Sequence, residues 1–242
     1  MHNFFINSEQ FKENKAIITG NDFNHIKNVL RMKIKDKLYV CDKQNGESFL
    51  AEIEDITNDS IICSTISKND STESKIKVTL FQGIPKSDKM ETIIQKSVEL
   101  GVYEIIPVEM KYCIAKVKDE NKILRWNKIS EAAAKQSKRN IIPEVKNVVK
   151  ISDICSKIKN YDISIVAFEN EKEYSIKDIL RNNKEKINSI AIIIGPEGGF
   201  SKEEVLALEE NGARAVSLGK RILRTETAPI TLLSMIMYEF EL

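Results

Sequence analysis

The chain has 242 residues, of which 42% are apolar, and its 37 lysines and arginines against 36 aspartates and glutamates leave a net charge of +1. This length fits one large domain or two small ones with a sizeable core, and without a long apolar run or a basic-then-apolar leader we expect a cytoplasmic protein that spans no membrane. Four widely spaced cysteines and only two histidines do not form a metal-binding motif, so we expect reduced thiols and no metal ion.

Residues 1–70 have the pattern of a small β-rich domain. Apolar and β-branched residues cluster in short runs separated by turn residues, which predicts four strands. The strands are expected at 15–19, 37–42, 48–53 and 60–66. A hairpin turn is expected at 44–46, because its Asn-Gly pair favours the turn that matches strand twist. A helical pattern covers 22–30, with Asn21 or Asp22 as its cap.

The polar stretch 69–74, rich in serine and threonine, is the best candidate for a linker. Beyond it strands and helices alternate, which is typical of an α/β domain with a mainly parallel sheet. The expected strands are 76–81, 103–108, 163–168, 190–194 and 215–218. The expected helices are 87–100, 125–138, one that follows Ser201 with a capping box to Glu204, and one that begins near Pro229. We therefore expect a second domain over 75–242.

Two strand ends in the C-terminal part each open into a loop that contains glycine. The run 190–194 is followed directly by Gly-Pro-Glu-Gly-Gly at 195–199, and the run 215–218 is followed by Gly219. The loop 220–227 then adds arginine, glutamate and threonine side chains. Ligands of open α/β sheets bind outside the carboxyl ends of the strands, so these loops are the candidate site. The alternative for the glycine cluster is a tight turn without a ligand.

The segments Gly-Pro-Glu-Gly-Gly-Phe-Ser at 195–201 and Leu-Gly-Lys-Arg-Ile-Leu-Arg-Thr-Glu-Thr-Ala at 218–228 together resemble the paired motif of the RsmE-type methyltransferases. Shorter stretches within 25–31, 94–102 and 131–139 are similar to the same family. This family methylates N3 of a uridine in 16S ribosomal RNA and belongs to the SPOUT class. The resemblance implies a PUA-like β-barrel over 1–70, then an α/β domain with a parallel sheet and a C-terminal trefoil knot that holds S-adenosylmethionine.

The chain departs from the family pattern at two places. His2-Asn3 stands where relatives usually carry an arginine near the initiating Met, and Tyr112-Cys113 stands where they usually carry an Arg-Ser pair.

The resemblance also implies the site residues. The residues expected to hold S-adenosylmethionine are Phe168, Gly195, Pro196, Gly198, Leu218, Gly219, Ile222, Leu223 and Thr227. Methylation of uracil N3 requires loss of a proton, which places negative charge on the carbonyl oxygens, and Arg224 is the candidate to stabilise this charge. Glu226 is the candidate base, and its alternative role is to pair with an arginine of its own loop. This displacement needs no metal.

A basic segment suggests how RNA is held. Residues 111–146 hold ten lysines or arginines against four aspartates or glutamates. This pattern indicates an electrostatic footprint for a polyanion or, alternatively, a solvated helix face. The candidate RNA contacts are His25, Arg31, Lys86, Lys89, Gln136, Lys138, Arg139 and Arg221. The alternative for His25 is a structural role, and the alternative for the lysines is to solubilise exposed helix ends.

The expected partners are 16S ribosomal RNA, within the small ribosomal subunit, and a second copy of the chain. The family's sites lie at a subunit interface, and the last helix carries an apolar stripe that would suit either a homodimer or the core. The stripe consists of Ile230, Leu233, Met237 and Phe240. Two other functions stay open: another methylation by the same fold class, such as ribose 2′-O methylation, and a non-catalytic role as an RNA-binding assembly factor.

Overall fold

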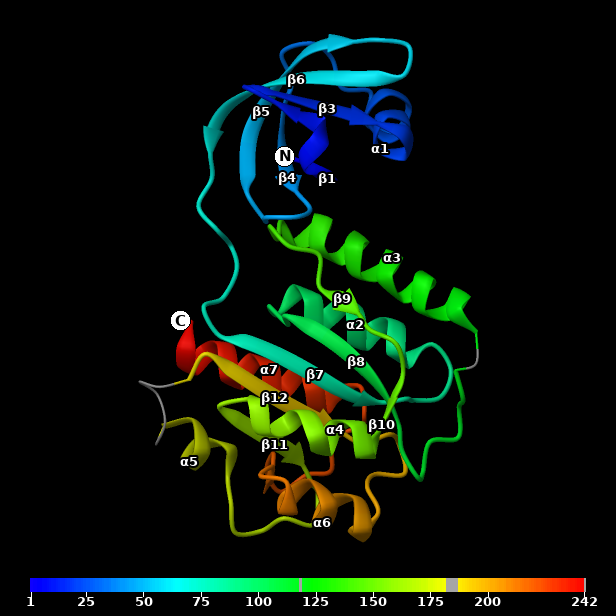
Figure 1. The fold of residues 1–242 in the computed structure, drawn as a ribbon, viewed down its shortest axis with the longest axis vertical. Coiled ribbons are helices and arrows are strands. Elements are labelled where there is room, and N and C mark those ends of the chain that lie inside the picture. The colour runs from blue at the N-terminus through cyan, green and yellow to red at the C-terminus, as the bar shows by residue number, and fades with distance from the viewer. Residues whose placement is uncertain (118, 182–186, 242) are drawn as a thin grey trace. The chain divides into compact units, whose positions relative to one another are not determined.

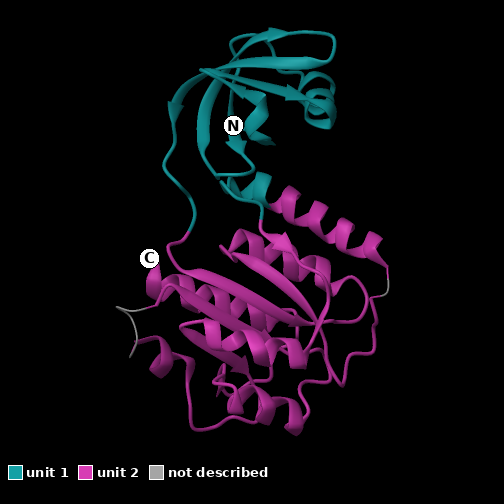
Figure 2. Ribbon diagram, viewed as in Figure 1, with its two compact units in different colours: residues 1–73, 134–142 teal, residues 74–133, 143–242 magenta. Residues whose placement is uncertain are grey.

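The computed structural model describes residues 1–117, 119–181 and 187–241. The chain forms two compact units (Figure 2). The smaller unit comprises Met1–Glu73 together with Ala134–Ile142, and the larger unit comprises Ser74–Ala133 together with Pro143–Leu242. Helix α3 (Glu120–Ser137) therefore begins in the larger unit, and its last turn counts with the smaller one. Hydrophobic periodicity does not reveal this discontinuity, because the helix is one element in the sequence.

The smaller unit is built on a six-stranded sheet in the order β1-β4-β5-β6-β3-β2. Its strands are β1 (Asn3–Ile6), β2 (Phe11–Lys12), β3 (Lys15–Thr19), β4 (Lys37–Asp42), β5 (Ser48–Ile56) and β6 (Ser60–Lys68). The β1–β4 pair is parallel and the other pairs are antiparallel. The four predicted strands are confirmed, and Gly46 has a φ of 71° in the predicted turn. The short strands β1 and β2 were not predicted, and β1 is buried along its whole length.

A short helix covers the core of this unit. Helix α1 (Gly20–Asn24) continues as a π-helix (His25–Leu30), and together they bury Phe23 and Ile26 against the strands. Alternate strand residues such as Ile18 face the same core. The helix expected over 22–30 is thus confirmed in position, with a π-helical second half that sequence periodicity cannot distinguish.

The predicted cap of this helix is wrong. The helix begins at Gly20, so Asn21 and Asp22 lie inside its first turn, and Thr19 precedes it without a side-chain capping bond. The carboxylate of Asp22 instead pairs with Lys135, whose Nζ lies 2.9 Å from Asp22 Oδ1. Asp22 therefore contributes an ion pair with a distant part of the chain and does not cap the helix.

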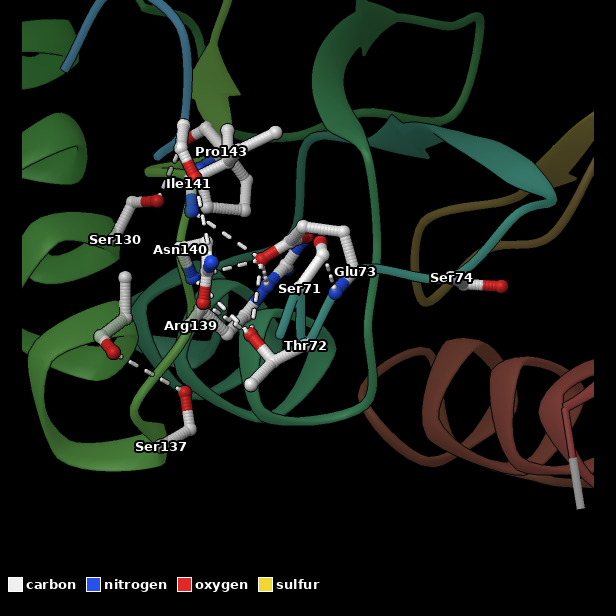
Figure 3. Close-up of polar contacts among 12 residues, drawn as sticks. Ser71, Thr72, Glu73, Ser74, Ser130, Ser137, Arg139, Asn140, Ile141 and Pro143 are labelled. Atoms are coloured by element: carbon white, nitrogen blue, oxygen red, sulfur yellow. Dashed lines mark hydrogen bonds and ion pairs between the residues drawn. The ribbon is translucent and has the colours of Figure 1, made fainter. Parts of the chain in front are cut away.

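Residues 134–142 are fastened to the smaller unit by buried polar contacts, which Figure 3 shows in close-up. The Glu73 carboxylate accepts hydrogen bonds from the Arg139 guanidinium and, through Oε1, from the backbone N–H groups of Asn140 at 3.0 Å and Ile141 at 3.2 Å. The side chains of Arg139 and Glu73 are only 7% and 15% exposed. We call Glu73, Arg139, Asn140 and Ile141 the Glu73 cluster.

The larger unit is an α/β domain, as the alternation of elements predicted. Its strands are β7 (Lys77–Gly83), β8 (Glu104–Glu109), β9 (Glu144–Val145), β10 (Val149–Lys150), β11 (Ile163–Ala167), β12 (Ser189–Ile194) and β13 (Arg214–Val216). They lie in the order β10-β8-β7-β12-β11-β13, with β9 beside β8, and each of these pairs is parallel. The apolar run of β12 is buried because this strand lies inside the sheet.

Helices flank this sheet (Figure 1). Besides α3 they are α2 (Lys89–Glu99), α4 (Ile151–Lys157), α5 (Ile176–Arg181), α6 (Lys202–Glu210) and α7 (Thr227–Phe240). Helix α2 packs against α7, and α4 packs against α6. The four predicted helices are confirmed, including the capping box of Ser201 and Glu204, whereas the short α4 and α5 were not predicted. Among the described residues, no helix combines the length and apolar character that a membrane crossing requires.

The apolar stripe of α7 serves mainly the core of its own unit. Leu233 and Met237 are buried, while Ile230 and Phe240 are half-buried. The helix packs against α2, α5 and β12. The stripe therefore fits the alternative that these residues pack in the core of their own unit.

Candidate functional site

Three strands of the larger unit end side by side. Ala167 at the end of β11 pairs with Ile194 at the end of β12 and with Val216 at the end of β13. The Phe168 N–H donates to the Val216 carbonyl oxygen at 3.0 Å and keeps the segment after β11 next to the end of β13. The loops that follow these strands therefore start at one carboxyl edge, which is where open α/β sheets bind ligands.

Two adjoining cavities lie among these loops. The larger has a volume of about 280 Å³ and the smaller about 90 Å³. Both are lined by Ala167, Glu169, Ile222, Leu223 and Ala228. The larger is also lined by Lys89, Ile194, Gly195, Pro196, Glu197, Gly199, Phe200, Arg224 and Thr225. The smaller is also lined by Phe168, Ser217, Leu218, Gly219, Lys220 and Arg221. Their walls combine apolar side chains with charged groups and loop backbone, a mixture that can hold a small molecule by packing and by placed polar contacts.

A buried chain of hydrogen bonds joins the two glycine loops. The Thr225 hydroxyl donates to the Gly195 carbonyl oxygen at 2.7 Å, and the Gln82 side-chain amide donates to Thr225 Oγ1 at 3.0 Å. Gln82 is the penultimate residue of β7 and is fully buried. At Gly83 an added Cβ would lie 2.6 Å from Pro196 Cδ, so the strand end and the loop touch directly. These contacts hold the wall of the larger cavity in place.

The glycines of the site serve different purposes. Gly199 has a φ of 68° and Gly219 a φ of 116°, which favour glycine. A Cβ added at Gly219 would meet no atom within 4 Å, so its backbone faces open space beside the smaller cavity. A Cβ added at Gly195 would instead lie 3.1 Å from the Gly199 backbone and from the Phe200 ring. Gly195 is therefore needed for the closure of its own loop.

Lys89 lies between two carboxylates at this site. Its Nζ is 3.1 Å from Glu197 Oε1 and 3.2 Å from Glu226 Oε2. The carboxylates of Glu197 and then Glu226 raise the pKa of Lys89 above its usual value, so the ammonium stays charged. Burial pushes the pKa of Glu197 upward, but its own backbone N–H, the Lys89 ammonium and the Lys86 N–H outweigh it and leave this pKa lowered. Both groups of the Lys89–Glu197 pair are thus ionised near neutral pH.

The cation nearest to Glu226 is not the expected one. Arg224 Nη1 lies 3.9 Å from Glu226 Oε1, and the Arg224 side chain is 82% exposed. Lys89 is closer and comes from the start of α2. The alternative role of Glu226, an ion pair with an arginine of its own loop, therefore corresponds to the longer of its two ion pairs, the other being with Lys89. The Arg224 guanidinium stays accessible.

Most of the residues predicted for the cofactor surround the two cavities. Those that line one or both are Phe168, Gly195, Pro196, Leu218, Gly219, Ile222 and Leu223. Gly198 and Thr227 line neither of these two cavities. The lining residues that the prediction did not include are Ala167, Glu169, Ile194, Glu197, Gly199, Phe200, Ser217, Lys220, Thr225 and Ala228. Phe200 and Thr225 could have been included from the sequence, because each lies within one of the two motif segments.

The residues predicted to contact RNA are divided between the units. The smaller unit holds His25, Arg31, Gln136, Lys138 and Arg139, and the larger unit holds Lys86, Lys89 and Arg221. His25, Arg31, Gln136, Lys138, Lys86 and Arg221 are exposed, as a contact to RNA requires. Lys89 is half-buried between its two carboxylates. The role of each exposed residue in RNA binding stays a prediction.

Arg139 is a correction. Its side chain is 7% exposed and its guanidinium bonds to Glu73 (Figure 3). An enclosed and paired guanidinium has no surface to offer a phosphate, so the prediction that Arg139 contacts RNA is wrong, and the residue instead holds the smaller unit together. Its partner lies 66 positions away in the sequence, where no local pattern indicates it.

The cysteine thiols are not arranged as metal ligands in the part of the chain that the structure describes. All four cysteines are free, and burial is the main cause that raises the pKa of each, that of Cys63 to about 12. Within the described ranges, no group of three histidine, cysteine, aspartate or glutamate side chains is arranged to hold a metal ion.

Comparison with known proteins covers the whole chain. A family model described as "RNA methyltransferase domain" matches residues 72–237, and one described as "RNA methyltransferase PUA domain" matches residues 18–66. The chain is 37% identical to the Ribosomal RNA small subunit methyltransferase E of Bacillus subtilis (strain 168), covering 100% of this chain and 98% of that protein. It is 38% identical to the protein of the same name from Mesomycoplasma hyopneumoniae (strain 232), covering 97% and 98%.

A solved structure is similar over the same extent. It is a Ribosomal RNA small subunit methyltransferase E from Neisseria gonorrhoeae, described as bound to S-adenosyl methionine. The TM-score is 0.88 with 29% sequence identity, and the match covers 99% of this chain and 98% of that one.

Proposed function

The chain belongs to the ribosomal RNA small subunit methyltransferase E family, and on that premise we propose that it transfers a methyl group from S-adenosylmethionine to N3 of a uridine in 16S ribosomal RNA. The observation that carries the proposal is the pair of cavities at the carboxyl edge of the larger unit's sheet, which are lined by the two glycine loops of the family motif. The activity belongs in the cytoplasm, where this RNA is found.

The residues around the cavities suit S-adenosylmethionine. Ile222, Leu223 and Ala228 supply apolar surface for an adenine ring, and the open backbone at Gly219 supplies polar groups at close range. The hydrogen bonds from Gln82 to Thr225 and from Thr225 to Gly195 hold the opposite wall in place. Bound there, the cofactor supplies an electrophilic methyl group, and the protein supplies its orientation.

The charged groups beside the larger cavity suit the other half of the reaction. Glu226 is the group to accept the N3 proton of the uracil, and Lys89 holds its carboxylate in place from α2. Arg224, whose guanidinium is accessible, stabilises the negative charge that develops on the uracil carbonyl oxygens. Lys89 is a positioning residue in this scheme, because it acts through Glu226.

We extend the proposal to the path and assembly of the chain. The C-terminal segment forms the trefoil knot of the SPOUT class. The hydrogen bond from Thr225 to Gly195 would hold the two loops of this knot together. The active form is a homodimer, in which the partner covers Ile222, an apolar side chain of the site loop that is 81% exposed. The substrate is 16S ribosomal RNA within the small subunit.

The test of the proposed function is the product nucleoside. The purified protein is incubated with S-adenosylmethionine and with small subunits or 16S RNA from a strain that lacks the gene, and the digested RNA is analysed by mass spectrometry. We expect N3-methyluridine. A 2′-O-methylated nucleoside would assign the other reaction of the fold class, and no methylated product with RNA still bound would indicate an assembly factor.

Gly195→Val should lower the affinity for S-adenosylmethionine at least tenfold. A Cβ at this position would lie 3.1 Å from the Gly199 backbone, so the larger side chain displaces the loop that lines the cavity. Calorimetry with the RNA-free protein measures the affinity. Gly101→Val is the control: Gly101 lies in the same unit with a φ of 86° and lines neither site cavity, so it should lose stability but keep the affinity. Unchanged affinity of Gly195→Val would misplace the cofactor site.

Lys138→Ala should weaken RNA binding evenly across RNA sequences. Lys138 is exposed near the end of α3 and has a φ of 59°. Phosphate contacts release counterions, so loss of one cation should lower the slope of log affinity against log salt by about 0.7 to 1. A salt titration with a 16S oligonucleotide measures this slope. Lys15→Ala, which removes an exposed lysine paired with Glu54, is the control and should leave the slope unchanged. An unchanged slope for Lys138→Ala would remove Lys138 from the RNA surface.

A further inference from the structure

Tyr112 lies on a turn that is fixed beside the candidate site. The turn follows β8, and the Cys113 N–H closes it by donating to the Met110 carbonyl oxygen at 3.0 Å. Met110 is buried and anchors one side of the turn. The Lys111 N–H donates to Glu204 Oε1 at 2.7 Å and ties the turn to the first turn of α6. Tyr112 is therefore held by its neighbours on both sides.

The glycine loop leaves room for this tyrosine. A Cβ added at Gly198 would lie 2.7 Å from Tyr112 Cβ, which is closer than two non-bonded carbon atoms approach. Gly198 lines neither site cavity, so contact with Tyr112 gives a reason for a glycine there. Its neighbours Glu197 and Gly199 both line the larger cavity. Tyr112 thus rests against the outer side of the cavity wall.

The tyrosine nevertheless stays open to solvent. It is 45% exposed, although its backbone is fixed and its Cβ is packed. Lys111 Nζ lies 5.9 Å from the centroid of the ring and 3.2 Å from Glu203 Oε2, so an ion-paired lysine lies beside the ring. An exposed aromatic ring is what proteins that bind single-stranded nucleic acid offer to its bases, because successive bases stack on such rings.

We propose that Tyr112 is a stacking platform for an unpaired base of the RNA substrate, at or next to the uridine that is methylated. The proposal rests on the proposed function. A base inside a helical stack cannot present its edge to a methyl donor, so the substrate nucleotide must be extruded or already unpaired. The extruded base and its neighbour then expose their faces, and Tyr112 offers a fixed aromatic surface one residue from the cavity wall.

The first measurement is RNA affinity of the full chain, with a 16S oligonucleotide that the wild-type protein binds and methylates. Tyr112→Ala should weaken RNA binding about 5- to 150-fold, the range for loss of one base–aromatic stack. Tyr112→Phe should bind as the wild type does, because the ring alone stacks. Both variants should bind S-adenosylmethionine with unchanged affinity, since Tyr112 lines neither cavity.

Tyr103 offers a matched control. It is 40% exposed and Lys77 Nζ lies 4.9 Å from its ring centroid, so it has a similar exposure and also has a lysine beside its ring. It precedes β8, whereas Tyr112 follows this strand, so it lies away from the carboxyl edge. Tyr103→Ala should bind RNA as the wild type does.

A second readout separates stacking from structural support. The only tryptophan, Trp126, is buried, so Tyr112→Trp places one accessible reporter on the turn. Its fluorescence should be quenched when RNA binds. The quenching should disappear with an oligonucleotide that is abasic at one position, either the target uridine or a direct neighbour, and the same abasic oligonucleotide should bind Tyr112→Ala and wild type equally well.

Several results would overturn the platform. They are wild-type RNA affinity of Tyr112→Ala, loss of S-adenosylmethionine affinity in that variant, a changed oligomeric state, or quenching that no abasic position removes. All of these comparisons use an oligonucleotide that the wild type methylates. A failure of the platform therefore leaves the methylation result standing, and absence of wild-type methylation would instead count against the proposed function.

Discussion

Glu226→Gln should lower the rate of methyl transfer by about 10²- to 10⁴-fold, the usual contribution of a general base. The amide keeps the size of the side chain but cannot accept the N3 proton of the uracil. The affinity for S-adenosylmethionine should change little, because Glu226 lines neither site cavity. Single-turnover kinetics with both substrates saturating measures the rate. Glu210→Gln, at an exposed carboxylate of α6, is the control.

Lys89→Met tests whether the base is positioned from α2. Since its pKa is raised, Lys89 stays protonated from about pH 6 to 9, below the ordinary lysine value of about 10.4. Its contribution is therefore present over that range and is lost only as the pH rises through the raised pKa. We expect Lys89→Met to be slower at every pH in this window, with Lys89→Arg closer to the wild type. For the Glu226 prediction above, a wild-type rate of Glu226→Gln would exclude its role as the base and give the loop 220–227 a structural role.

Glu73→Ala should destabilise the smaller unit by about 3–5 kcal/mol, the usual cost of removing one partner of a buried ion pair. The Arg139 guanidinium would remain buried without its carboxylate, and the N–H groups of Asn140 and Ile141 would lose their acceptor. This loss is a large fraction of the stability of a typical domain. Arg139→Ala should have an effect of the same order, because it leaves the Glu73 charge uncompensated.

Urea denaturation measures this loss, and separate transitions are expected for two units. Glu54→Ala removes an exposed ion pair of the same unit, with Lys15, and should leave the free energy of unfolding close to that of the wild type. Glu73→Gln should fall between wild type and Glu73→Ala, because its carbonyl oxygen still accepts hydrogen bonds. An unfolding curve of Glu73→Ala that overlays the wild type would exclude a stabilising role for the Glu73 cluster.

The sequence predicted the elements that are long enough to show a period. The strands β3 and β4 were predicted with the bounds that the structure gives, because their apolar residues are bounded by turn residues. The two-residue strands β9 and β10 have no period to detect. Helix α5 has six residues, fewer than two turns. The shortness of these elements explains why no pattern indicated them.

The candidate site was predictable where a backbone requirement marks the sequence. The glycine loops identified the edge of the sheet, since Gly199 and Gly219 both have positive φ. The electrostatic partners were not predictable. Lys89 and Arg139 looked alike as exposed cations, yet each pairs with carboxylates from distant parts of the chain. Long-range ion pairs leave no local pattern, so only the fold could separate them from surface lysines and arginines.

The Glu73 cluster also sets an order of events during synthesis. The carboxylate of Glu73 leaves the ribosome well before its partners, because Arg139, Asn140 and Ile141 are translated 66 to 68 residues later. At about 5–20 residues per second, the delay is roughly 3–14 s. During that time the first 73 residues can pair their strands but cannot bury Glu73 with a partner. The smaller unit begins first on the ribosome, and it is completed only after half of the chain has been made.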